Sequence, residues 1–146
     1  MEERLTIRPI LTVRPISILF ATLFLGAFGT VWYGVLFTGI QVESHRYTAE
    51  EYASSHPAWY MGGFLISLLI AWGLGLLVRL GGVPGWKGGV AAGLRAAVGF
   101  GIPLVSFPLV FSPLHELPLY AVGFFQIVIA WTIAGAILGS MSKQSN

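Results

Sequence analysis

Residues 59–78 read WYMGGFLISLLIAWGLGLLV, a run that contains no charged side chain. A helix needs around 20 apolar residues to cross a hydrocarbon core of about 30 Å. This run has that length, so it predicts a membrane-spanning helix. It sets the fold class for the rest of the chain.

Three other runs are long and apolar enough to span a bilayer: residues 16–40, 90–111 and 117–139. The first follows the basic stretch RLTIRPILTVRP, residues 4–15, which resembles the start of a signal peptide. Its apolar run is too long for a signal peptide, and no small-x-small cleavage site follows it. We therefore expect one all-α domain over residues 1–146, an integral membrane four-helix bundle.

The composition agrees with a chain solvated mainly by lipid. Hydrophobic residues make up 55% of the 146 residues and charged residues only 10%, whereas a soluble domain carries about 25% charged residues. The chain has no Cys, which excludes disulfides and thiolate metal sites. Its eight Lys and Arg residues are scattered between apolar runs, so we expect no nucleic-acid partner.

The distribution of Lys and Arg predicts the orientation of the helices. Seven of the eight basic residues flank alternate ends of the spans: Arg4, Arg8, Arg14, Arg79, Lys87, Arg95 and Lys143. The other connections hold only Arg46. Because cytoplasmic loops are enriched in Lys and Arg, we expect both termini and the connection between the second and third spans to lie in the cytoplasm, in the inner (plasma) membrane of a bacterial cell.

Small residues recur at intervals of four along the third run. They are Gly89, Gly93, Ala97 and Gly101, and the fourth run carries Gly135 and Gly139. Such a stripe lets two helix backbones approach closely in lipid. We expect it to pack against another helix of this chain, with a partner subunit as the alternative.

Two prolines interrupt the same third run. Pro103 and Pro108 each lack an N–H and crowd a carbonyl four residues earlier, so we expect a kinked helix. Arg95 lies on the side of this helix away from the glycine stripe, which suits contact with lipid or with a neighbouring chain.

The first run ends in an aromatic pair, Trp32 and Tyr33, within GTVWYGVLF, residues 29–37. At 1.5 Å per residue, Trp32 lies about 24 Å along a helix that begins near Ile16. From depth alone, the pair is typical of the aromatic belt at a membrane interface.

The stretch GAFGTVWYGVLF, the later TAEEYA and the terminal GAILG together resemble a family of small four-helix bacterial membrane proteins, the family of unknown function numbered seventeen-sixty-one. The matching motif positions at the end of the first helix are Gly29, Trp32, Tyr33 and Phe37. The resemblance implies no activity. It does imply that Trp32 and Tyr33 pack helices or anchor a loop, with a ligand role as the alternative.

Residues that could carry chemistry are few. Gln126 is the most polar side chain at depth, and no ionisable group lies near the middle of a span. The remaining candidates are all expected on the outer side: Glu43, His45, His56, His115 and Glu116. Their spacing is not that of a metal site, apart from the adjacent His115 and Glu116, so we expect no metal. A capping-box pattern, Thr48 and Glu51, predicts a short surface helix in the same outer connection.

These observations favour a protein that is not an enzyme and has no cofactor. We expect a non-catalytic accessory or packing subunit whose partners are membrane lipid and either other membrane subunits or copies of itself, as a homo-oligomer. A small oligomeric transporter or channel is the first alternative. The second is a binder of a quinone or pigment, since Trp72 and Trp131 lie too deep for the outer belt.

Overall fold

The computed structural model describes residues 13–45, 48, 50, 57–83, 85–111 and 117–142. The regular secondary structure in this part of the chain is helical. Its elements are α1 (Pro15–Val31), η1 (Trp32–Leu36), α2 (Thr38–His45), α4 (Pro57–Leu80), α5 (Gly85–Ala96), η2 (Ala97–Gly101), α6 (Ile102–Phe111) and α7 (Leu117–Met141), where η marks a π-helical segment.

Four helical stretches among the described residues are long and apolar enough to cross a membrane. They are Pro15–Leu36, Tyr60–Leu80, Gly85–Phe111 and Leu117–Met141. The first joins α1 to η1, and the third joins α5, η2 and α6. The four runs expected from the sequence therefore correspond to four helical spans.

Two span boundaries differ from the expected ones by several residues, and the others by two residues or fewer. The first run was expected to continue to residue 40, but the helix breaks at Phe37, whose backbone angles (φ −124°, ψ 25°) are not helical. The chain then turns into the separate helix α2. The third span begins at Gly85 rather than at residue 90, so its glycine-rich first turn is also helical.

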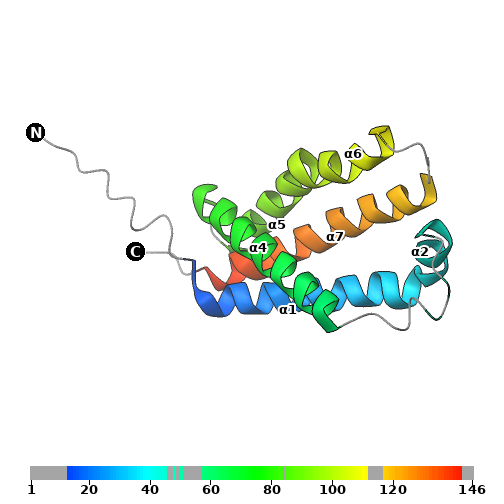
Figure 1. Ribbon diagram of the computed structural model, residues 1–146. Helices are drawn as coiled ribbons and strands as arrows, with labels where there is room; N and C mark the ends of the chain where they lie inside the picture. Colours follow the sequence, from blue (N-terminus) through cyan, green and yellow to red (C-terminus); the bar gives the residue numbers. More distant parts are fainter. Residues whose placement is uncertain are drawn as a thin grey trace, which may run out of the picture.

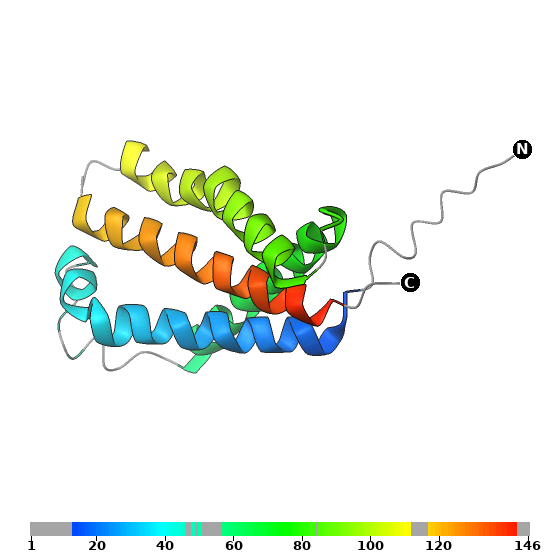
Figure 2. The same cartoon turned by 180° about the vertical axis from the view of Figure 1, so that it is seen from behind.

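Helix α7 is central in the bundle (Figures 1 and 2). It lies between α1 on one side and α5 and α6 on the other, while α4 crosses the bundle obliquely and contacts α1, α5 and α7. The start of α1 and the end of α7 lie at one end of the bundle, and α2 lies at the other. The spans therefore alternate in direction.

The interior consists mainly of small side chains. Nine residues form the core cluster: Ala21, Leu25, Ala71, Leu74, Val78, Ala96, Ala130, Ala134 and Leu138. The buried hydroxyls of Ser17, Thr22 and Ser67 each donate to a backbone carbonyl three or four residues earlier in the chain. Most large apolar side chains instead lie on the outside, an arrangement that suits a lipid solvent better than water.

The third span changes its helical geometry where Pro103 requires it. Residues Ala97–Gly101 form the π-helical segment η2, in which the N–H of Ile102 donates to the carbonyl of Ala97, five residues earlier. Such wide turns occur as local bulges in α-helices, and this one directly precedes the proline that cannot donate. Pro108, where a kink was also expected, lies inside α6, which continues as α-helix around it.

Candidate functional site

The motif at the end of α1 lies against the first half of α7. The indole Nε1 of Trp32 donates to the backbone carbonyl of Val122 at 3.3 Å. A Cβ atom added at Gly123 would lie 3.5 Å from the hydroxyl oxygen of Tyr33. Trp32 and Tyr33 therefore both reach the Val122–Gly123 step of α7.

An aromatic row leads along α1 to this contact. Phe24 and Phe28 have ring centroids 5.6 Å apart, Phe28 stacks on Trp32 at 5.2 Å, and Trp32 meets Phe37 at 4.9 Å. The first two steps have the four-residue spacing that aligns side chains on an α-helix. The last step spans five residues.

The π-helical segment η1 explains the five-residue step. The N–H of Phe37 donates to the carbonyl of Trp32 at 2.9 Å, and the hydroxyl of Thr38 donates to the carbonyl of Tyr33 at 3.1 Å. A π-turn holds one more residue than an α-turn, so Phe37 comes to lie over Trp32 as a residue four positions away would do in an α-helix. The motif spacing is thus the spacing of a π-turn.

Gly29 completes the motif at the same interface. A Cβ atom there would lie 3.9 Å from Nε2 of Gln126, so the polar side chain predicted at depth in the fourth run faces the first helix. The site therefore brings together an indole N–H, a phenolic hydroxyl and an amide. Groups of these types can form hydrogen bonds but do not change charge at neutral pH.

The glycine stripe of α5 packs against α7 of the same chain. A Cβ atom at Gly89 would overlap the carbonyl oxygen of Gly135, and one at Gly93 would overlap that of Trp131. A Cβ atom at Gly139 would lie 2.5 Å from the carbonyl oxygen of Gly85 and 2.8 Å from Cα of Gly89. The two helices therefore meet backbone to backbone along this face.

Farther along the third span, side chains of α7 replace its backbone in the contact. A Cβ atom at Gly101 would overlap Cγ2 of Ile127 and lie 3.3 Å from the Trp131 ring, while Ala97 is fully buried. The three glycines predicted in the third run and the two in the fourth thus meet at one interface within the chain, and Ala97, the other stripe position, is buried. A partner subunit is not needed to cover them.

The other candidates are not brought together by the described structure. Glu43 is exposed on α2, whereas His56, His115 and Glu116 lie outside the described residues, as does the side chain of His45. The capping-box residue Glu51 also lies outside them.

The two deep tryptophans have different surroundings. Trp72 is 45% exposed on α4, whereas Trp131 is partly buried against the core cluster. Sequence reasoning missed the partners of the α1 motif, Val122 and Gly123. The one available signal was Gly123 itself, a glycine three residues before Gln126 in an otherwise bulky apolar segment.

Comparisons with known proteins agree with the resemblance carried by the motif. No curated protein and no solved structure matches the chain. The family described as "Protein of unknown function (DUF1761)" matches residues 16–139, a range that includes all four spans from α1 to nearly the end of α7. The chain belongs to this family.

Proposed function

We propose that the protein is a non-catalytic membrane subunit that assembles with copies of itself or with a larger complex of the inner (plasma) membrane. The observation that carries the proposal is the exposure of helix α6. This helix has no buried residue, although α5, which precedes it in the same span, is packed closely on α7.

The exposed side chains of α6 are large. Leu104, Phe107, Val110 and Phe111 are 64–70% exposed, and the rings of Phe107 and Phe111 lie 4.5 Å apart. Hydrocarbon tails are as apolar as these side chains, so association of membrane helices depends on van der Waals packing. Two adjacent aromatic rings offer a broad rigid surface for such packing.

The polar groups within the spans support a role without catalysis. The hydroxyls of Ser67, Ser106 and Thr22 each donate to a carbonyl of their own helix. The charged side chains of the described spans are Arg79, Lys87 and Arg95, and all three are basic. Arg79 and Lys87 flank the connection between α4 and α5, and Arg95 lies in the last turn of α5. An acid or base at depth is the usual mark of a proton pathway or a membrane enzyme.

The same charges support an orientation with both termini in the cytoplasm. Arg14, Arg79 and Lys87 belong to the end of the bundle where α1 begins, and Glu43 belongs to α2 at the opposite end. Positive charge favours the cytoplasmic side.

The oligomeric state in native membranes tests the assembly. The protein is extracted with its surrounding lipid in polymer-bounded discs and weighed by native mass spectrometry. We expect a mass well above one chain of 15.8 kDa, and a shift towards the single chain when Phe107 and Phe111 are both replaced by Ala.

The matched control replaces two exposed residues of α4, Leu65 and Leu69, by Ala, and it should leave the assembly intact. A single chain in the wild-type discs contradicts the proposal, and so does an equal loss of assembly in both double variants.

A further inference from the structure

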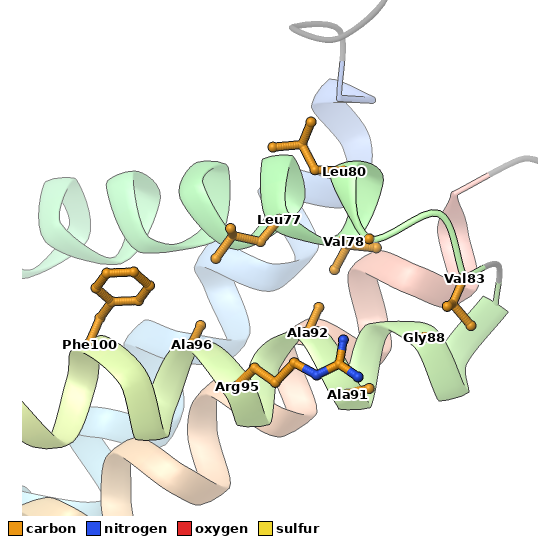
Figure 3. A pocket seen from close by; sticks show the side chains of 11 residues that line it. Leu77, Val78, Leu80, Val83, Gly88, Ala91, Ala92, Arg95, Ala96 and Phe100 are labelled. Atoms are coloured by element: carbon orange, nitrogen blue, oxygen red, sulfur yellow. The ribbon is translucent and has the colours of Figure 1, made fainter.

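A groove of about 310 Å³ opens between the last turns of α4 and the outward face of α5 (Figure 3). This volume is at the lower end of the range for small-molecule sites. The residues that form its walls include Leu77 and Val78 on α4, Ala92 and Ala96 on α5, and Phe100 in η2. Apart from Arg95, the side chains that line it are apolar.

The groove is open because α5 presents only small residues on this side. Ala92 and Ala96 point towards Leu77 and Val78 across the gap, and Ala91 also lines the groove (Figure 3). The glycines of α5 meanwhile hold the helix against α7. The helix therefore cannot move towards α4 to close the gap without giving up its contact with α7.

Arg95 supplies the one charged group of the lining. Its side chain runs along the wall towards the first turn of α5, and its guanidinium lies beside Ala91 (Figure 3). Side chains on a helix point towards its N-terminus, and a long basic side chain in a span extends in this way towards the headgroups.

The guanidinium has no ion-pair partner among the described residues. The acidic residues described, Glu43 and Glu50, belong to the connection between the first two spans, which joins them at the other end of the bundle. A planar guanidinium matches the oxygens of a phosphate and can bind two of them at once.

We propose that this groove binds a phospholipid with an anionic headgroup. The lipid phosphate lies on the guanidinium of Arg95, and one acyl chain fills the apolar groove between Leu77 and Phe100. The long axis of the groove fits this arrangement, since Gly88 and Phe100 are about 18 Å apart along the helix. This site does not depend on the assembly proposed for α6.

The test compares lipid binding by the full chain in detergent. Phosphatidylglycerol and phosphatidylcholine with identical acyl chains are titrated separately, and bound lipid is counted by native mass spectrometry. We expect one phosphatidylglycerol to be retained and phosphatidylcholine to bind at least about tenfold more weakly. We also expect Arg95→Gln to lower the affinity for phosphatidylglycerol by about tenfold or more. This is the loss expected for one hydrogen-bonded charged pair.

Two further variants separate the charge from the groove. Lys87→Gln removes a basic residue of the same helix that does not line the groove, and it should leave binding unchanged. Ala91→Phe keeps the charge but fills the groove, so it should weaken binding as much as Arg95→Gln does. Inorganic phosphate alone, added in excess, should not displace the lipid.

Three results would overturn the proposal: equal retention of both lipids, unchanged binding in Arg95→Gln, or displacement of the lipid by free phosphate. Arg95 is exposed, so Arg95→Gln should melt at the wild-type temperature in lipid-free detergent. A lower melting point there would also count against the proposal, because it would make Arg95 a residue of the fold.

Discussion

The indole nitrogen of Trp32 and the carbonyl oxygen of Val122 are 3.3 Å apart, although 90 residues separate them in the sequence. This hydrogen bond joins the end of the first span to the first half of the last one. Next to it, the hydroxyl of Tyr33 lies close to Gly123. The family motif in α1 therefore has its counterpart in two residues of α7 that carry no conspicuous signature of their own.

Replacement of Trp32 by Phe should lower the free energy of unfolding by about 1 kcal/mol. The ring would still stack on Phe28, but the donor to Val122 would be lost, and a net hydrogen bond contributes about that much. Unfolding by sodium dodecyl sulfate in mixed micelles measures the change. Trp72→Phe, on an exposed part of α4, is the control and should be neutral. Equal stability of both variants would show that the hydrogen bond from Trp32 to Val122 does not stabilise the fold.

Replacement of Gly93 by Ala should destabilise the protein, although Ala is the better helix former by about 1 kcal/mol. A Cβ atom at Gly93 would overlap the backbone of α7 at Trp131, and a backbone cannot rotate away as a side chain can. Gly73→Ala in α4 is the control, because nothing lies within 4 Å of the new atom. We expect thermal unfolding in detergent to show opposite signs for the two variants. A change of stability with the same sign in both variants would mean that α5 and α7 are not in backbone contact at Gly93.

Deletion of Gly34 should be tolerated, because it removes one residue from the π-turn of η1 and leaves an α-turn. Gly34 is exposed, with nothing within 4 Å of its Cβ position. Deletion of Ala27 from the regular part of α1 should instead prevent folding, since it rotates Trp32 by about 100° relative to the residues before it. The yield of monodisperse protein and its melting temperature compare the two. Similar behaviour of both deletions would contradict the role given to η1.

Single cysteines at Glu43 and Ser142 should react with a membrane-impermeant thiol reagent from opposite sides, with residue 43 outside. Both positions are exposed, and the chain has no native Cys to interfere. The expectation follows from the bias of Lys and Arg towards the end where α1 begins. Intact cells and inverted membrane vesicles give the two measurements, and labelling of both sites from one side would refute the topology.

Liposomes that contain the purified protein should show no proton leak above that of empty liposomes. A proton carrier needs a titratable group that is reachable from both sides of the membrane, and the charged side chains of the described spans are all basic: Arg79, Lys87 and Arg95. A pH-sensitive dye inside the liposomes measures the leak under an imposed gradient. A leak that Glu43→Gln abolishes would favour the transporter over the accessory subunit.

The sequence predicted the spans well because length and hydropathy are local properties. It also placed Arg95 on the side of its helix away from the glycines, where the structure has it exposed. The break at Phe37 was not predicted, because a π-turn changes the helical period without changing the hydrophobic pattern. The partner of the glycine stripe remained open for a different reason. A small-residue face shows that a backbone can approach, but not whose backbone it is.

The central place of α7 also has a consequence for biosynthesis. The indole of Trp32 donates a hydrogen bond to α7, the glycines of α5 contact its backbone, and α4 packs on it as well. During translation this helix is the last of the four spans to leave the ribosome. The three earlier spans therefore enter the bilayer before their main packing partner is made. A chain that stops before residue 117 would leave Trp32 and the glycine face uncovered, and quality-control proteases could then recognise them.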